Sequence, residues 1–321
     1  MGHEPLLILG TGALAGLFAA RLAAAGHPVT MAGTWPAALH ALAAHGVRLA
    51  EPDGTTRAFE VQVQHREALA RGPWAGALVL VKAWQTAAAA QAAARALPPE
   101  ASVLTLQNGL GPQEVLQQTL AADRMVVGVT TYAARVRAPG WVQATGQGTV
   151  DLARHPAAGF WQRVLQAAGF QVRVHPDVQG LIWGKLAVNA AINPLTALLD
   201  VPNGALLEDP AARLFMARAA TEVARVARAL GIALPFADPA AAAEAVARRT
   251  AANSSSMRED LRRGAPTEID AICGAVVRAG QRVGQPAPLN AALWAMVRER
   301  VAQTQARLDE TRAATTSQPG P

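Results

Sequence analysis

The sequence predicts an α/β protein in two parts: a mainly parallel, doubly wound sheet with helices on both faces, followed by an all-helical C-terminal domain. Three observations lead to this prediction. Short apolar runs alternate with Ala-rich helical stretches over the first half, the pattern of parallel strands joined by crossover helices. Strand patterns end after Val174, and only helical patterns follow. The length of 321 residues is more than one compact domain usually takes.

The strands of the first half follow from short apolar runs, expected over 6–9, 29–32, 77–81, 102–106 and 126–130. Helices are expected from Gly12 to Ala25 and over 86–96. Residues 46–64 predict a hairpin that turns at Pro52–Gly54, because the flanks alternate in polarity around turn-forming residues. A second hairpin is expected around 138–140.

The second half has helical periodicity over 178–199, 210–230, 238–250, 255–263, 268–283 and 288–308. The change of character places a domain junction near His175. We therefore expect one domain over 1–175 and a second over 176–310. The remaining 311–321 has no apolar period and is expected to be a disordered tail.

Composition excludes several classes of protein. Apolar residues make up 51% and charged residues 16%, which is enough to fill globular cores. The single cysteine, Cys273, excludes a disulfide framework and a cysteine-based zinc cluster, and no metal site is expected. The net charge of +6 is spread as single arginines, so no nucleic-acid partner is expected. The uncharged stretch 5–20 lacks a basic start and contains glycines, so neither a signal peptide nor a membrane segment is expected. We expect a cytoplasmic protein, monomeric or homodimeric.

The stretch PLLILGTGALAG at 5–16 supplies the pattern G-x-G-x-x-A between an apolar strand and a helix. Gly10 allows the tight turn, Gly12 lets a pyrophosphate approach the backbone, and Ala15 allows close helix–strand packing. The free N–H groups of the helix N-terminus then face the phosphates. This predicts a Rossmann-type dinucleotide site, whose residues are Gly10, Thr11, Gly12, Ala13, Leu14 and Ala15.

The end of the second strand usually selects the cofactor, with an acid for NAD and a base for NADP. Here the strand ends in MAGTW, with neither. Thr34 can donate one hydrogen bond, and no acid between Leu9 and Leu49 would repel a 2′-phosphate. The sequence favours NADPH, and NADH is not excluded.

Lysine is scarce in this chain. Of 29 basic residues only Lys82 and Lys185 are lysines, and both lie in apolar stretches. Lysine is a compact ammonium whose pKa can move, whereas arginine holds its proton. Lys185 is followed by Asn189 and Asn193 at intervals of four, so the three polar groups share one helix face. Burying them without partners would cost several kcal/mol, which indicates a functional site.

Two later motifs, NSSSM at 253–257 and TEID at 267–270, offer Ser256 and Glu268 as further polar groups for this cleft. The alternative is structural, with Ser254 or Ser255 as a helix cap and Thr267–Glu268 as a helix start.

Together these motifs resemble the ketopantoate reductase (2-dehydropantoate 2-reductase) family. The resemblance spans nearly the whole chain and rests on GTGALAG, VKAWQ (81–85), QNGLG (107–111), TTYAAR (130–135), WGKLAVNAAINPLTALLDVPNG (183–204), NSSSM and PTEIDAICG (266–274). It implies a C-terminal domain arranged as in 6-phosphogluconate dehydrogenase. It also implies NADPH-dependent reduction of the C2 ketone of ketopantoate to pantoate, in pantothenate and coenzyme A biosynthesis.

The resemblance also implies residue roles. Lys185 matches the catalytic lysine and general acid, and Glu268 the acid beside it. Substrate-binding positions are matched by Asn189, Asn193, Asn203 and Ser256, and positions near the nicotinamide by Lys82 and Asn108. Two departures are Ala15 at the third glycine and Thr34 where an arginine is usual. Two alternatives stay open: a related 2-oxo acid or opine-type reductase, and a non-catalytic NADP(H)-sensing regulator.

Overall fold

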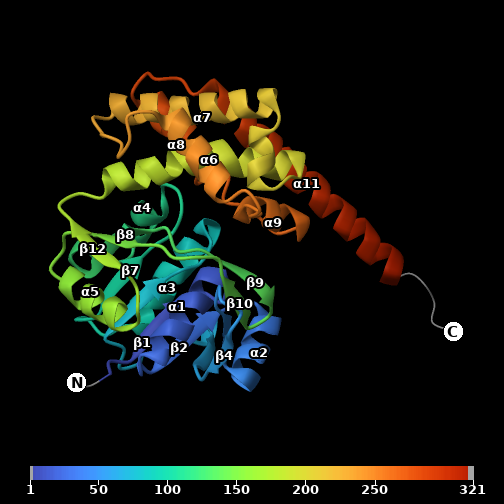
Figure 1. Cartoon of the computed structure of the whole chain (residues 1–321). Helices are drawn as coiled ribbons and strands as arrows, with labels where there is room; N and C mark the ends of the chain where they lie inside the picture. The colour runs from blue at the N-terminus through green and yellow to red at the C-terminus, as the bar shows by residue number, and fades with distance from the viewer. Residues whose placement is uncertain (1–2, 317–321) are drawn as a thin grey trace. The chain divides into compact units, whose positions relative to one another are not determined.

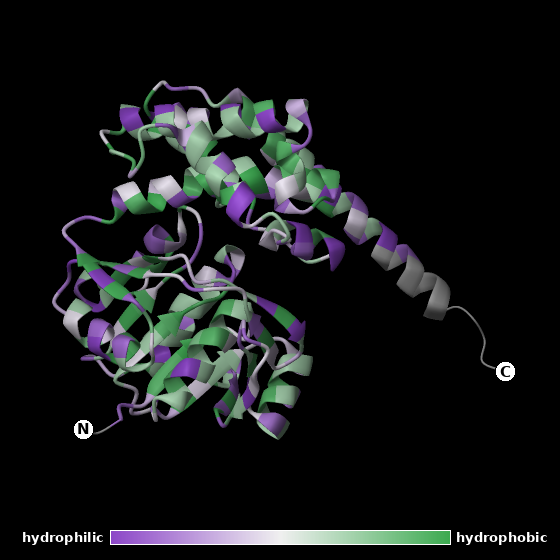
Figure 2. Ribbon diagram, in the orientation of Figure 1, coloured by the Kyte–Doolittle hydropathy of each residue, from purple (hydrophilic) through white to green (hydrophobic). Residues whose placement is uncertain are grey.

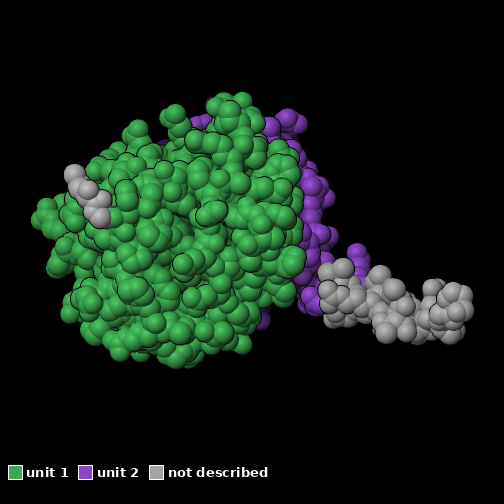
Figure 3. Space-filling view, turned by 90° about the horizontal axis from the view of Figure 1, so that it is seen from below, with its two compact units in different colours: residues 1–107, 111–178 green, residues 108–110, 179–321 purple. Residues whose placement is uncertain are grey.

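The computed structural model describes residues 3–316, and the chain divides into two compact units (Figure 3). The first unit holds the chain up to Gln107 together with Gly111–Val178. The second holds Asn108–Leu110 and the chain from Gln179 onward. The division thus falls three residues after the junction expected at 175/176, and a short loop of the N-terminal half belongs to the helical unit. That loop is held by the Leu110 N–H, which donates to the Ala271 carbonyl at 2.9 Å.

The first unit is built on an eight-stranded sheet with the order β12-β11-β8-β7-β6-β1-β2-β5 (Figure 1). Neighbouring strands are parallel except β11 and β8, which confirms the doubly wound α/β prediction. The strands are β1 (Leu6–Leu9), β2 (Val29–Gly33), β5 (Gln62–His65), β6 (Gly76–Val79), β7 (Ser102–Thr105), β8 (Met125–Thr130), β11 (Val150–Ala153) and β12 (Val172–His175).

Helices cover both faces of this sheet because the central strands are apolar on both sides. In β1, Leu6 and Ile8 face a core that includes α1 and α5, whereas Leu7 and Leu9 face a second core with α3. Figure 2 shows these strands as a continuous apolar layer. The helical segments of this unit are α1 (Ala13–Ala24), α2 (Pro36–His45), η1 (Arg66–Ala68), η2 (Ala83–Gln85), α3 (Thr86–Ala96), α4 (Pro112–Gln117), η3 (Ala122–Arg124) and α5 (Ala158–Ala167).

A second, four-stranded sheet contains both expected hairpins. Its order is β4-β3-β10-β9, with β3 (Val47–Ala50), β4 (Thr56–Phe59), β9 (Ala134–Ala138) and β10 (Trp141–Ala144). The Asp53 carboxylate accepts from the Thr55 N–H at 2.9 Å and fixes the first turn. The first hairpin is shorter than the sequence predicts, however. Its second strand ends at Phe59, and Gln62–His65 crosses to the main sheet to pair with β2 as β5.

The second unit is helical, and its described residues share one buried core around α6. It contains α6 (Gln179–Leu199), η4 (Asn203–Leu207), α7 (Pro210–Ala229), α8 (Pro239–Arg249), α9 (Ser256–Arg262), α10 (Cys273–Arg282) and α11 (Pro288–Thr316). Two differences from the sequence expectations concern helix ends. Helix α10 begins at Cys273 and not at 268, and α11 continues through 311–316, where a disordered tail was expected; residues 317–321 lie outside the described part.

Helix α6 continues through Pro194, which has no N–H to donate to the Ala190 carbonyl. The buried Cys273 thiol lies 4.0 Å from that oxygen and supplies a weak donor in its place. Among residues 3–316, no helix is long and apolar enough to cross a membrane.

Candidate active site

The polar column predicted on α6 is present. Lys185, Asn189 and Asn193 all lie on this helix and all three are half-buried, whereas the flanking Trp183, Leu186 and Ala190 are buried in the core. One side of α6 therefore packs into the helical core and another carries an ammonium and two amides. The spacing of four residues aligns the three polar heads along the axis.

Glu268 is close enough to Lys185 for its charge to act on the ammonium, and its side chain is buried. Burial lowers the pKa of Lys185 to about 8, although the Glu268 carboxylate raises it. The two charges come from distant parts of the sequence. Glu268 lies in the irregular segment before α10, so the structural alternative of a helix start at Thr267–Glu268 is wrong.

Asn108 extends this cluster. Its side-chain amide donates to Glu268 Oε2 at 3.4 Å, and the loop Asn108–Leu110 belongs to the helical unit. Gly109 adopts φ +80°, and a side chain there would collide with the Ala271 backbone. The structure thus brings Asn108 into contact with Glu268, the acid that acts on Lys185, although the two residues are 160 positions apart in the sequence.

Ser256 is the exposed first residue of α9, and its neighbour Ser255 is the helix cap. Ser255 Oγ accepts from the Arg258 N–H at 3.1 Å and lies 2.8 Å from Thr196 Oγ1 on α6. The capping role that the sequence left open therefore falls on Ser255. Ser256 is held at the start of α9 with its hydroxyl not used as the cap.

Asn203 lies away from open solvent, in contact with the loop that precedes α9. Its Nδ2 donates to Thr250 Oγ1 at 2.9 Å, and its backbone N–H donates to the Asn253 carbonyl. The Oδ1 atom is buried and has no hydrogen-bond partner among the described residues. The hydrogen bonds of Asn203 therefore hold the start of η4 against the segment between α8 and α9.

The glycine fingerprint sits where the sequence places it, between β1 and α1. Gly10 has φ +136°, and a Cβ there would lie 2.9 Å from the Leu80 carbonyl oxygen, so only glycine fits. A Cβ on Gly12 would meet nothing within 4 Å, which leaves open space at the start of α1. The first turn of α1 has no side-chain cap and no acid. These features fit an anionic pyrophosphate at the helix N-terminus.

Thr34 and Lys82 follow β2 and β6, the two strands that flank β1. Because carboxyl ends of parallel strands meet at one edge of a sheet, both residues lie at the same edge as the glycine turn. Both are half-buried. No group of three or more His, Cys, Asp or Glu that could hold a metal occurs among the described residues.

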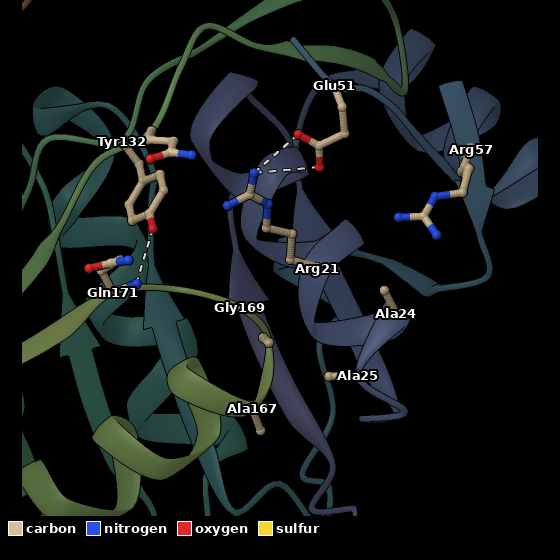
Figure 4. A pocket seen from close by; sticks show the side chains of 11 residues that line it. Arg21, Ala24, Ala25, Glu51, Arg57, Tyr132, Ala167, Gly169 and Gln171 are labelled. Carbon is tan, nitrogen blue, oxygen red and sulfur yellow. Dashed lines mark hydrogen bonds and ion pairs between the residues drawn. The ribbon is translucent and has the colours of Figure 1, made fainter. Parts of the chain in front are cut away.

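A hollow of about 460 Å³ lies elsewhere in the first unit, at the C-terminal end of α1 (Figure 4). Several of its polar groups contact one another. Arg21 pairs with Glu51 at 3.1 Å, and its guanidinium lies over the Tyr132 ring, whose hydroxyl accepts from the Gln171 N–H. Since the glycine turn is at the other end of α1, this hollow is not the dinucleotide site.

Comparison with known proteins finds matches along most of the chain. Residues 6–157 match the family described as ketopantoate reductase PanE/ApbA, and residues 177–301 match its C-terminal part. The 2-dehydropantoate 2-reductase of Halobacterium salinarum is 39% identical over 282 residues, covering 85% of this chain and 90% of the relative. The 2-dehydropantoate 2-reductase of Vibrio cholerae is 33% identical over 302 residues, covering 91% of this chain and 96% of the relative.

The chain is also similar to solved structures. A PanE/ApbA family ketopantoate reductase from Ralstonia eutropha superposes with a TM-score of 0.87 at 32% identity, covering 94% of this chain and 99% of that one. A D-mandelate dehydrogenase solved with NADH and anilino(oxo)acetate gives a TM-score of 0.89 at 24% identity over the same shares, a likeness of fold alone.

Proposed function

Because this chain belongs to the ketopantoate reductase family, we propose that it reduces the C2 ketone of ketopantoate to pantoate, a step of pantothenate biosynthesis. The observation that supports this most directly is the half-buried Lys185 paired with the buried Glu268. A lysine whose pKa is lowered to about 8 is a proton donor near neutral pH. NADPH is the proposed cofactor, and it supplies the hydride.

The chemistry assigned to Lys185 follows from where charge develops. Reduction of a ketone builds negative charge on the carbonyl oxygen, and a cation beside that oxygen stabilises the transition state more than the ground state. Lys185 then gives its proton to the same oxygen. Glu268 keeps the amine protonated until that step, and Asn108, which donates to Glu268, orients the carboxylate.

The amides and the hydroxyl nearby are neutral donors. Asn189, Asn193 and Ser256 hold the substrate's carboxylate and hydroxyl without adding a second cation that competes with Lys185. Gly10, Gly12 and the N-terminus of α1 hold the pyrophosphate of the cofactor. With one buried cysteine and no disulfide, we place the reaction in the cytoplasm.

The test is a substrate and cofactor panel. Purified protein is mixed with ketopantoate, pyruvate or 2-oxoisovalerate, and the loss of absorbance of NADPH and NADH is followed in parallel. We expect the highest kcat/KM with ketopantoate. A higher value with another 2-oxo acid would identify a different reductase of the same plan. Tight NADPH binding without turnover of any 2-oxo acid would favour the regulator.

A further inference from the structure

Two of the arginines in the described part of the chain are buried, and they differ in their partners. Arg258 donates to the Asp200 carboxylate at 2.9 Å and to the Asp200 carbonyl at 2.8 Å. Bonds from Arg262 and Arg258 lower the pKa of Asp200 to about 2. Arg66 is equally buried, with 9% of its surface exposed, yet its guanidinium has no hydrogen bond, ion pair or aromatic contact to any described residue. None of the Arg66 nitrogens is among the fully buried side-chain atoms that lack a partner, so the charged head keeps contact with solvent, where an anionic ligand can reach it.

Arg66 lies at the edge of the sheet where a dinucleotide binds. It follows β5 directly, and β5 is parallel to β2, with His65 opposite Gly33. Continuing the register one residue puts Arg66 beside Thr34, and neighbouring strands are about 4.8 Å apart. An extended arginine side chain spans more than that distance. Arg66 can therefore reach a group bound over the end of β2.

The same edge carries the glycine turn. The Gly10 N–H donates to the Ala32 carbonyl of β2 at 2.8 Å. A Cβ on Gly33 would collide with the Thr11 side chain at 2.6 Å, so the end of β2 and the glycine turn are in direct contact. The adenosine ribose of a dinucleotide whose pyrophosphate lies at α1 sits over the end of β2. Its 2′ position is where NADPH carries a phosphate.

We propose that Arg66 binds the 2′-phosphate of NADPH and supplies the cation that Thr34 does not. The inference rests on the proposed function for the identity of the cofactor. A guanidinium makes two parallel bonds to a phosphate, and Thr34 adds one neutral donor. The site recognises a ribose phosphomonoester, and it selects NADPH over NADH through a residue on the neighbouring strand.

The competing structural explanation is that the Arg66 stem only fills space while its head meets water through the exposed 9%. The two explanations differ in one measurable respect. A packing role affects NADPH and NADH binding equally, because both need the same fold. A phosphate contact affects only the ligand that carries the 2′-phosphate.

The experiment is calorimetric titration of the full chain with NADPH, NADH, 2′,5′-ADP and 5′-AMP. Arg66→Gln keeps most of the side-chain volume and removes the charge. We expect its affinity for NADPH and 2′,5′-ADP to fall by about 10- to 100-fold, as for loss of a hydrogen bond to a charged group. Affinity for NADH and 5′-AMP stays unchanged. Arg66→Lys keeps the charge and should retain part of the affinity for NADPH and 2′,5′-ADP that Arg66→Gln loses.

The control is Arg71→Ala, at an exposed arginine of the same unit. This substitution should leave all four affinities unchanged.

Equal weakening of NADPH and NADH in Arg66→Gln, or no weakening of either, overturns the proposal. If that variant does not fold, the wild-type protein decides the question. The preference for 2′,5′-ADP over 5′-AMP then falls as salt is raised, and the absence of any such preference overturns it. The result is separate from the proposed function: a selective loss of 2′-phosphate binding in a protein that reduces no 2-oxo acid refutes the reductase and keeps the phosphate site. A protein that binds neither nucleotide refutes both.

Discussion

Lys185 and Glu268 illustrate how two opposing effects set the pKa of one ammonium group. Removing the ammonium from water favours the neutral amine and lowers its pKa, while the carboxylate nearby favours the charged form. The result, about 8, lies far below the value of 10.5 for a free lysine. A group poised there holds its proton at pH 7 and releases it to a stronger base. An arginine at this position would supply the charge but not the proton.

This pair predicts a pH dependence. As pH rises through about 8, Lys185 becomes neutral and can neither donate nor stabilise charge, so kcat/KM for ketopantoate reduction falls above that pH. In Glu268→Gln the raising effect of the carboxylate is lost, and the fall moves to lower pH. The profile is measured by following NADPH oxidation from pH 6 to 10. An unchanged midpoint in Glu268→Gln would mean that the carboxylate does not act on the titrating group.

The Lys185→Ala variant is the companion experiment. Turnover should drop by at least about 10²-fold, as loss of a proton donor typically does. NADPH affinity, measured by calorimetry, should stay at the wild-type value because the glycine turn is untouched. Near-normal turnover in this variant would remove Lys185 from the mechanism.

At the scale of elements, a buried acid organises the start of the longest helix. Helix α11 begins at Pro288, and the preceding Ala287 has no side chain that can cap it. Glu222 of α7 takes this role: its two oxygens accept from the Leu289 and Asn290 N–H groups at 2.9 Å each. Asn290 Nδ2 adds a third bond to Glu222. Two helices distant in sequence are thus joined through the free donors of a helix N-terminus.

Glu222→Ala therefore leaves buried donors unsatisfied. We expect the free energy of unfolding to fall by about 1–3 kcal/mol in urea denaturation. The matched control is Glu299→Ala on the exposed face of α11, which should change stability by less than about 0.5 kcal/mol. Equal effects of the two substitutions would show that the cap does not stabilise the helical unit.

The elements that the sequence predicts well are those whose partners are close in sequence. Helix α3 has the expected bounds, 86–96, because Ala-rich periodicity and the flanking turns are local. The VQVQ stretch at 61–64 is the opposite case. Its alternation suits the hairpin strand or a strand of the main sheet equally, and only pairing with β2, far away in sequence, decides between them.

The same reasoning applies to the site. The column on α6 is visible as a spacing of four, since helix geometry alone puts Lys185, Asn189 and Asn193 together. The Asn108–Glu268 bond joins positions 160 residues apart, and no periodicity marks it. Arg66 was missed because 27 arginines look alike in the sequence, and only the structure shows that this one is buried and lacks a partner.

At the scale of the whole molecule, each buried core lies inside one unit. Two apolar clusters belong to the sheet unit and one to the helical unit. The dinucleotide fingerprint belongs to the first unit, and the Lys185 cluster, including Asn108, belongs to the second. The residues proposed to bind the cofactor pyrophosphate and those proposed to bind the substrate therefore belong to two units, each with its own buried core.

Separate cores predict separate unfolding transitions that respond to different ligands. In scanning calorimetry, NADPH at 100 times its dissociation constant should stabilise the sheet unit by about 2.7 kcal/mol and raise its midpoint. Ketopantoate without cofactor should raise the midpoint of the other transition, through the Lys185 column. Lys185→Ala should abolish the second shift and keep the first. If a single transition is seen and both ligands raise its midpoint, the two units unfold as one; if two transitions are seen and each ligand moves both equally, the assignment of each ligand to its own unit is wrong.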